Sequence, residues 1–194
     1  MKMGDFEKIF VNSPSHSRRV SLQAIKLLEY ASPRPGQKYL DVGTGNGAAP
    51  IYIARTFGLD ATGVDVDPDQ IRIANDRSRG MQHVRFLTLD GAGLPFEDGE
   101  FDVVAASKVT HHVPAWRSLL QEMARVIKPG GYLILSDLVF PAAIAALGEK
   151  AAGGWMGFPT TRGLREFMQD NQFSTVHTSQ SPIYFEGVFR KPGS

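Results

Sequence analysis

The hydrophobic positions along the chain alternate between two patterns, short β-branched runs and longer segments with helical spacing. The runs are predicted to be strands: YLDVG at 39–43, ATGVDV at 61–66, VRFLTLD at 84–90, DVVAAS at 102–107 and YLILSDLV at 132–139. Segments with apolar residues three and four positions apart lie between several of them, at 47–57, 68–78 and 114–127. Because strands that alternate with helices favour βαβ units, the pattern predicts an α/β fold with a parallel, doubly wound sheet.

Two flanking regions extend this core. Residues 13–31 are predicted to form an amphipathic helix with Ser13 as its cap. After the core, 141–159 has no strong period and is a candidate mobile lid. A helix near 160–171 and two closely spaced strand-like runs, which favour an antiparallel pair, complete the chain. We expect one domain over 1–194, with a helical cap at 1–36, a core at 37–140, a lid and helix at 141–171 and a strand pair at 172–194.

Composition and charge exclude several classes of protein. With 42% hydrophobic and 21% charged residues, the 194-residue chain is typical of one folded globular domain. Its net charge of +1, with Lys and Arg spread along the sequence, predicts neither a nucleic-acid nor a membrane partner. The absence of cysteine excludes disulfides, thiolate zinc sites and cysteine nucleophiles, and it fits the reducing cytoplasm in which we expect the protein.

The motif LDVGTGNG at 40–47 places three glycines directly after a predicted strand and at the start of a helix. Unpaired backbone N–H groups at such a place favour a ligand with a negative group. The spacing Gly43-x-Gly45-x-x-Ala48, with Asp65 at the end of the next strand, also fits the dinucleotide-binding pattern. An NAD-binding oxidoreductase is therefore one interpretation, and a plain strand-to-helix turn around Gly47 is another.

Carboxylates at three successive strand ends narrow the choice of ligand. Asp41 could accept from an ammonium group, Asp65 from two ribose hydroxyls and Asp90 from an exocyclic amine. The pyrophosphate of a dinucleotide would be repelled by so many carboxylates. The ligand that suits them is an adenosine joined to a sulfonium amino acid.

Four segments, in this order, resemble the class I S-adenosylmethionine-dependent methyltransferases, in particular the small type 11-like group with a bare core. They are LDVGTGNG, GVDVDPDQI, LDGAGLPFEDGEFDVV and MARVIKPGGYLILSD, and they span about residues 38–138. The resemblance implies a Rossmann-like sheet of seven strands, mostly parallel, in which the last strand runs against the others. It also implies S-adenosylmethionine as cofactor and S-adenosylhomocysteine as product.

The resemblance assigns cofactor contacts residue by residue. Asp41 and the loop residues Gly43, Thr44, Gly45 and Gly47 would surround the methionine part of the cofactor. Asp65 would bind the ribose hydroxyls with Val66 beside the adenine, and Asp90 with Gly91 would hold the adenine amine. Ser107, just after the fourth strand, would contact the amino acid end through its backbone.

The segment SKVTHHVP at 107–114 faces the methyl group and the acceptor in the resembling proteins. His111 and His112 lie here, and imidazole is the natural base at neutral pH. Many methyltransferases of this group have a histidine pair at this place, so the pair marks either the fold or the chemistry. We take both as candidate catalytic residues, with His111 preferred. Two adjacent histidines without cysteine are a poor zinc set, so no metal site is expected.

Lys108 and Asp137 complete the candidate catalytic set. Lys108 departs from the apolar or small residue usual in the resembling proteins. It could bind a carboxylate, phosphate or phenolate of the acceptor, or extend outward as a surface lysine. Asp137, at the end of the fifth predicted strand, could orient a base or cap the following turn.

The function that we expect is methyl transfer to O, N or another nucleophilic atom of a small-molecule acceptor. A homodimer in which a partner completes the pocket is left open. An NAD-dependent oxidoreductase would need a Tyr-x-x-x-Lys or similar element, and none is evident. A third interpretation is a non-catalytic module of the same fold, against which the intact set of Asp41, Asp65 and Asp90 argues.

Overall fold

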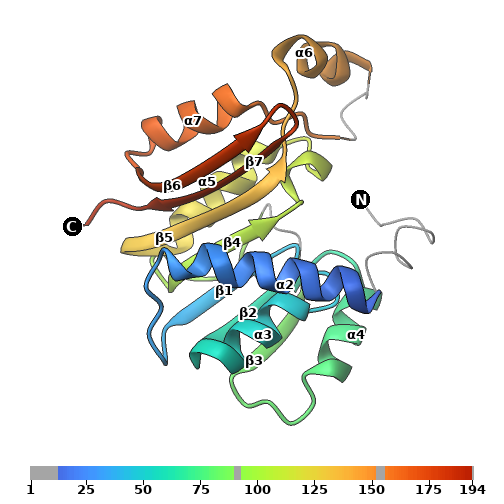
Figure 1. Cartoon of the computed structure of the whole chain (residues 1–194), viewed down its shortest axis with the longest axis vertical. Helices are drawn as coiled ribbons and strands as arrows, with labels where there is room; N and C mark the ends of the chain where they lie inside the picture. Colours follow the sequence, from blue (N-terminus) through green and yellow to red (C-terminus); the bar gives the residue numbers. More distant parts are fainter. Residues whose placement is uncertain (1–12, 90–92, 152–155, 194) are drawn as a thin grey trace.

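The computed structural model describes residues 13–89, 93–151 and 156–193, and its centre is a seven-stranded sheet of order β3-β2-β1-β4-β5-β7-β6 (Figure 1). The strands are β1 Lys38–Val42, β2 Asp60–Asp65, β3 Val84–Thr88, β4 Phe101–Ser107, β5 Ile127–Leu138, β6 Ser174–Ser181 and β7 Tyr184–Arg190. Strands β1 to β5 pair in parallel, and β7 is antiparallel to both of its neighbours. The predicted doubly wound sheet, with its last strand reversed, is confirmed.

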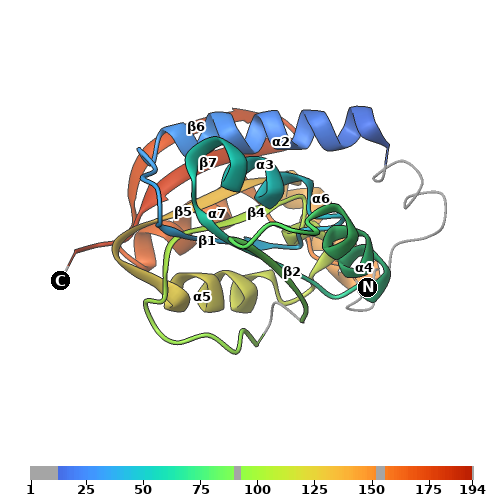
Figure 2. The same ribbon diagram turned by 90° about the horizontal axis from the view of Figure 1, so that it is seen from below.

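Helices cover both faces of the sheet. They are α2 Pro14–Glu29, α3 Ala48–Phe57, α4 Pro68–Arg77, α5 Trp116–Val126, α6 Ala142–Ala151 and α7 Thr161–Asp170, with a short 3-10 helix, η1, at Thr110–His112. Figure 2 shows α2 and α3 on one side of the sheet and α5 on the other. The strand arrows of β1 and β4 end on the side of the molecule where α2 begins (Figure 1). Residues at the carboxyl ends of these strands therefore share one edge.

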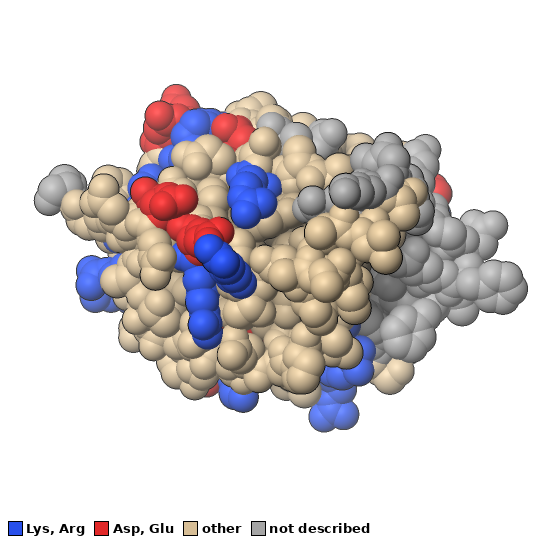
Figure 3. All heavy atoms as spheres, turned by 90° about the horizontal axis from the view of Figure 1, so that it is seen from above, with Lys and Arg blue, Asp and Glu red and all other residues tan. Residues whose placement is uncertain are grey.

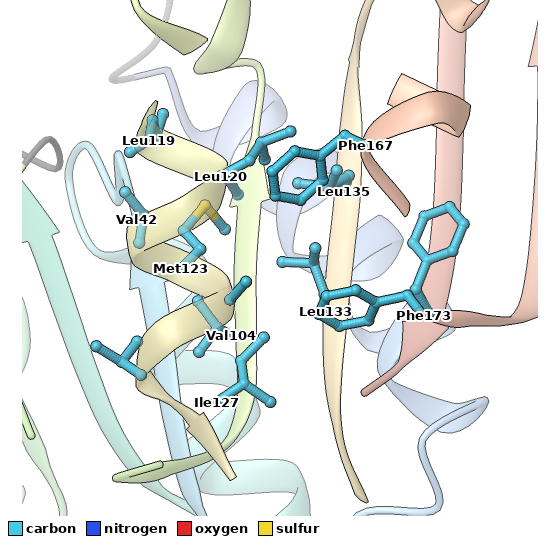
Figure 4. Close-up of a cluster of buried hydrophobic side chains, with 14 of the residues drawn as sticks. Val42, Val104, Leu119, Leu120, Met123, Ile127, Leu133, Leu135, Phe167 and Phe173 are labelled. Atoms are coloured by element: carbon cyan, nitrogen blue, oxygen red, sulfur yellow. The ribbon is translucent and has the colours of Figure 1, made fainter. Parts of the chain in front are cut away.

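Alternation along the strands supplies the core on each face. Leu133 and Leu135 of β5 pack with α5 and α7, whereas Ile134 between them packs with α2 and α3. In Figure 4 the side chains of Leu119, Leu120 and Met123 on α5 lie beside Val42, Val104 and Ile127, and those of Leu133, Leu135, Phe167 and Phe173 lie together next to them. Burial of this much aliphatic surface on both faces fixes the strand ends that build the site.

The segment at 141–159 contains a helix, although its hydrophobic residues do not recur at helical spacing. Residues Ala142–Ala151 form α6, which is rich in alanine, the strongest helix former. Its residues Ile144 and Leu147 are 53% and 70% exposed, so the helix has little apolar contact from which a period would arise. High intrinsic propensity explains a helix that hydrophobic periodicity does not reveal.

The described surface seen from above is largely uncharged. Figure 3 shows blue and red side chains next to one another on one side of this view, without a patch of one sign among the residues it describes. One exposed pair of this kind is Arg162 with Glu166 on α7, whose Nε and Oε1 atoms are 2.7 Å apart. None of the helices in the described part of the chain is both long and apolar enough to span a bilayer.

Candidate cofactor and acceptor site

The glycine motif forms a tight loop between β1 and α3. Gly43, Gly45 and Gly47 have φ values of 73°, 54° and 75°, in the left-handed region that favours glycine. A Cβ on Gly43 would lie 2.2 Å from a methyl group of Val109, and one on Gly47 would lie 2.5 Å from the Phe86 ring. The loop thus packs directly against the segment that follows β4, and no larger residue fits at these two positions.

Asp65 lies at the carboxyl end of β2 and is bonded to this loop. Its Oδ2 accepts a hydrogen bond from the Gly45 N–H at 2.8 Å, and its Oδ1 accepts from the Asp67 N–H at 2.9 Å. Asp67 in turn caps α4 by accepting from the Asp69 N–H. Val66, beside them, is 45% exposed. The predicted ribose carboxylate and the exposed apolar neighbour for the adenine therefore lie at the same edge as the glycine loop.

Asp41 is a buried carboxyl group of β1, only 5% exposed. Burial raises the pKa of Asp41 to about 7; the Thr44 side chain partly offsets this, and the charge of Asp65 adds to it. A buried carboxylate without a cation is unfavourable. A cationic group bound beside Asp41 would restore its charged form, which fits the ammonium predicted for this position.

Gln70 is a buried polar residue beside the predicted cofactor contacts that the sequence analysis did not single out. Its side chain is fully buried in the first turn of α4, and neither of its amide atoms has a hydrogen-bond partner in the described part of the chain. A buried amide without partners is destabilising. The sequence signal that could have revealed Gln70 is that it is a polar residue on the buried face of α4, which it shares with the apolar residues Ile71 and Ala74. Its place three residues after Asp67 makes it a candidate contact for the cofactor.

His111 of η1 and Asp137 of β5 form a buried pair, in the region where the sequence predicts the acceptor. The His111 Nδ1 is 2.5 Å from the Asp137 Oδ1, and the two residues are 7% and 2% exposed. Asp137 also accepts from the N–H groups of Val109, Thr110 and Leu138 and from the Thr110 hydroxyl, at 2.6–2.8 Å. Asp137 therefore orients an imidazole, one of the two roles that its sequence position left open, and the turn that it holds is the one after β4 instead of the turn that follows Asp137 itself.

This pair fixes the chemistry of the imidazole. Because a carboxylate only accepts, it pairs with the Nδ1–H tautomer of His111, the tautomer in which Nε2 has the free lone pair. The His112 ring lies next to it, with ring centroids 3.9 Å apart. The arrangement is that of a base held by a carboxylate, with the His111 ring placed by Asp137 and the His112 ring tilted by 40° at its side.

The segment after α6 closes on this turn. The Gly157 N–H donates to the carbonyl oxygen of His111 at 3.1 Å. A Cβ at Gly157 would lie 2.3 Å from the Val113 carbonyl oxygen and 2.4 Å from that of Thr110. Only glycine allows this approach, so the backbone at 157 forms one wall of η1.

Lys108 and Ser107 lie where β4 ends. Lys108 has a left-handed φ of 58°, and its N–H donates to the Ser136 carbonyl oxygen at 2.7 Å. Burial lowers the pKa of Lys108, the Arg19 charge lowers it further, and Asp137 acts in the opposite direction. The structure thus brings Ser107, Lys108, His111 and Asp137 to one edge. The predicted adenine contacts Asp90 and Gly91 lie outside the described residues.

Comparisons with known proteins agree with this geometry. Residues 40–135 match the family model described as a methyltransferase domain. Methyltransferase GfsG of Streptomyces halstedii is 33% identical over 142 residues, which cover 72% of this chain and 51% of that protein. The 27-O-demethylrifamycin SV methyltransferase of Amycolatopsis mediterranei (strain S699) is 34% identical over 140 residues, 69% of this chain and 52% of that one. The chain spans about half the length of these curated relatives.

A solved structure shows the same fold. The geranyl diphosphate C-methyltransferase of Streptomyces coelicolor A3(2) superposes with a TM-score of 0.75 at 17% identity, over 93% of this chain and 86% of that one. At this level of identity the similarity concerns the fold alone. Together with the family match over the motif segments, these similarities identify the chain as a member of the class I S-adenosylmethionine-dependent methyltransferases.

Proposed function

We propose that the protein transfers the methyl group of S-adenosylmethionine to a nucleophilic atom of a small-molecule acceptor, with His111 as general base. The observation that supports this most is the buried pair of His111 and Asp137. His111 lies in the short turn directly after Val109, the residue that packs against Gly43 of the glycine loop. A base within one short turn of the cofactor loop can receive the proton of an acceptor aligned with the methyl group.

On the cofactor side, the proposed contacts divide by chemical group. Asp41 pairs with the ammonium group, and the loop from Gly43 to Gly47 borders the methionine portion. Asp65 and Gln70 meet the adenosine portion, with Val66 beside the adenine ring. S-adenosylmethionine, when bound, supplies an activated methyl group, so the protein needs only to align the acceptor and manage its proton.

On the acceptor side, the Nε2 of His111 takes a proton while Asp137 stabilises the imidazolium that forms. A hydroxyl needs this base more than a thiol does, because both lose a proton on methylation but a thiol ionises far more readily at neutral pH. The name of the rifamycin relative, which describes an O-demethylated acceptor, supports oxygen as the first choice. Nitrogen remains the second.

The first experiment is calorimetric titration of the protein with S-adenosylmethionine, S-adenosylhomocysteine and NAD under one set of conditions. We expect binding of the first two ligands and none of NAD. Binding of NAD alone would refute the proposal, and binding of none of the three would favour a module that does not use this cofactor.

A second experiment tests the base. With phenols, hydroquinones and aliphatic alcohols as acceptors, release of S-adenosylhomocysteine is measured for the wild type, His111→Ala and Asp137→Asn. We expect turnover to fall by about a hundredfold or more in His111→Ala, with cofactor affinity unchanged. His83→Ala is the matched control, because His83 forms an exposed pair with Asp60 at the opposite edge of the sheet. Equal turnover in His111→Ala and the control would remove His111 from the mechanism.

A further inference from the structure

Lys108 has an unusual backbone for a residue with a side chain. Its φ of 58° lies in the left-handed region, which disfavours residues with a Cβ. The conformation is fixed on both sides: the Lys108 N–H bonds to the Ser136 carbonyl oxygen, and the next N–H, that of Val109, bonds to Asp137. The turn thus presents a long cation at the end of β4, at a position where a strained backbone often accompanies function.

Lys108 is also not an ordinary surface lysine. It is half-buried, and no carboxylate lies within ion-pair distance of its ammonium group in the described part of the chain. Lys38 and Lys128, by contrast, pair with Glu100 and Asp102. The charge of Asp137 raises the pKa of Lys108, but the oxygens of Asp137 already accept hydrogen bonds from His111 and the η1 turn. The charge of Lys108 therefore lacks a partner of its own.

Hydrogen bonds connect α2 to the turn that contains Lys108. Gln23 of this helix donates to the Tyr184 hydroxyl at 2.6 Å and to Glu186 at 3.1 Å, and the Tyr184 hydroxyl lies 2.6 Å from that of Ser136. Ser136 is the residue whose carbonyl holds Lys108, so these contacts tie α2 to the Lys108 turn. Figure 1 shows the beginning of α2 on the side of the sheet where β4 ends.

Arg19 lies one helical turn before Gln23 and is exposed. It forms no ion pair within the described residues, and its charge is close enough to lower the pKa of Lys108. Two like charges near each other repel unless an anion lies between them. Glu186, an acidic side chain beside this helix, already accepts a hydrogen bond from Gln23. An anion bound between the cations would relieve the repulsion.

We propose that Lys108 and Arg19 form an anion-binding pair that holds a carboxylate or phosphate group of the acceptor next to His111. The inference rests on the proposed function, since it names the acceptor class for the same site. The pair would place the acceptor with its charged end at Lys108 and a nucleophilic atom toward the imidazole. A small acid with a hydroxyl group satisfies both contacts.

The test measures binding of three probes to the protein saturated with S-adenosylhomocysteine, by NMR titration at constant ionic strength. Benzoate and inorganic phosphate are the two anions, and benzamide is the neutral counterpart of benzoate. The variants are Lys108→Met, Arg19→Gln and the charge-preserving Lys108→Arg. Lys26→Gln is the control, because Lys26 is an exposed cation in the last turn of the same helix.

We expect at least one anion to bind saturably and about tenfold or more tighter than benzamide, and each charge-removing variant to lose about tenfold in that affinity. Lys108→Arg and Lys26→Gln should retain it. The preferred anion distinguishes a carboxylate from a phosphate acceptor. Binding of neither anion, equal binding of benzoate and benzamide, or unchanged affinity in Arg19→Gln would overturn the proposal. Failure of the wild type to bind S-adenosylhomocysteine at the outset would instead refute the proposed function.

Discussion

The substitution Asp41→Asn removes the buried carboxyl group of the predicted cofactor site and almost preserves the shape of the side chain. Burial raises the pKa of Asp41 from its ordinary value of 3.8 to about 7 in the folded chain. Between these two values the folded protein holds a proton that the unfolded chain has released. Stability from this group is therefore greatest at acid pH and declines as the pH rises toward 7.

The size of the effect follows from the shift. Each pKa unit corresponds to about 1.4 kcal/mol, so a shift of about three units corresponds to about 4 kcal/mol at most. From pH 5 to pH 8 the unliganded wild type should lose about 2–3 kcal/mol of unfolding free energy that Asp41→Asn does not lose. The variant should be the more stable protein at pH 8 and should lose its affinity for a ligand whose ammonium group needs the carboxylate.

Urea denaturation of both proteins without ligand at pH 5, 6, 7 and 8 provides the measurement. The difference between the two unfolding free energies isolates Asp41, since every other titrating group is common to both proteins. A difference that stays constant over this pH range would show that Asp41 is already ionised when buried, and the argument from burial would be refuted.

Two further substitutions test other parts of the site. Gln70→Leu removes a buried amide without partners, so the unliganded protein should be equally or more stable in urea. The same change should weaken S-adenosylhomocysteine binding about tenfold in calorimetry. Lower stability with unchanged affinity would make Gln70 a structural residue. Gly157→Ala should lower both the urea midpoint and the turnover, because the added methyl group would displace the carbonyl oxygens of Thr110 and Val113 around His111. Normal turnover would show that the η1 turn adapts freely.

The sequence predicts most of the fold because its signals are local. Each of the strands expected from β-branched runs is present within a few residues of its predicted bounds, as are the helices at 14–29, 48–57, 68–77 and 116–126. In these segments propensity and periodicity agree with tertiary packing. The exception, α6, has strong propensity, but its large apolar residues Ile144 and Leu147 are exposed, so periodicity could not reveal it.

The candidate site is predicted less completely, because its decisive contacts join distant residues. Residue types alone place Asp41, Asp65 and Asp137 at strand ends, since carboxyl ends of parallel strands share an edge. Nothing local shows that Asp137 meets His111 rather than His112, as this depends on the short η1 turn and on its contact with Gly157. The exposure of Lys108 and the orphaned amide of Gln70 likewise depend on packing across the whole domain.

The position of β7 in the sheet has a consequence for how the chain is made. β7 lies between β5 and β6 although it follows both along the chain, so β5 has an open edge from the synthesis of residue 138 until residue 184 and beyond have left the ribosome. During that interval the apolar strand YLILSDL exposes unpaired backbone groups that another nascent chain could pair with. The hairpin of β6 and β7 ends this exposure, because β7 pairs with β5 from Tyr132 to Leu138, so this edge is covered only once residues 174–190 have been made.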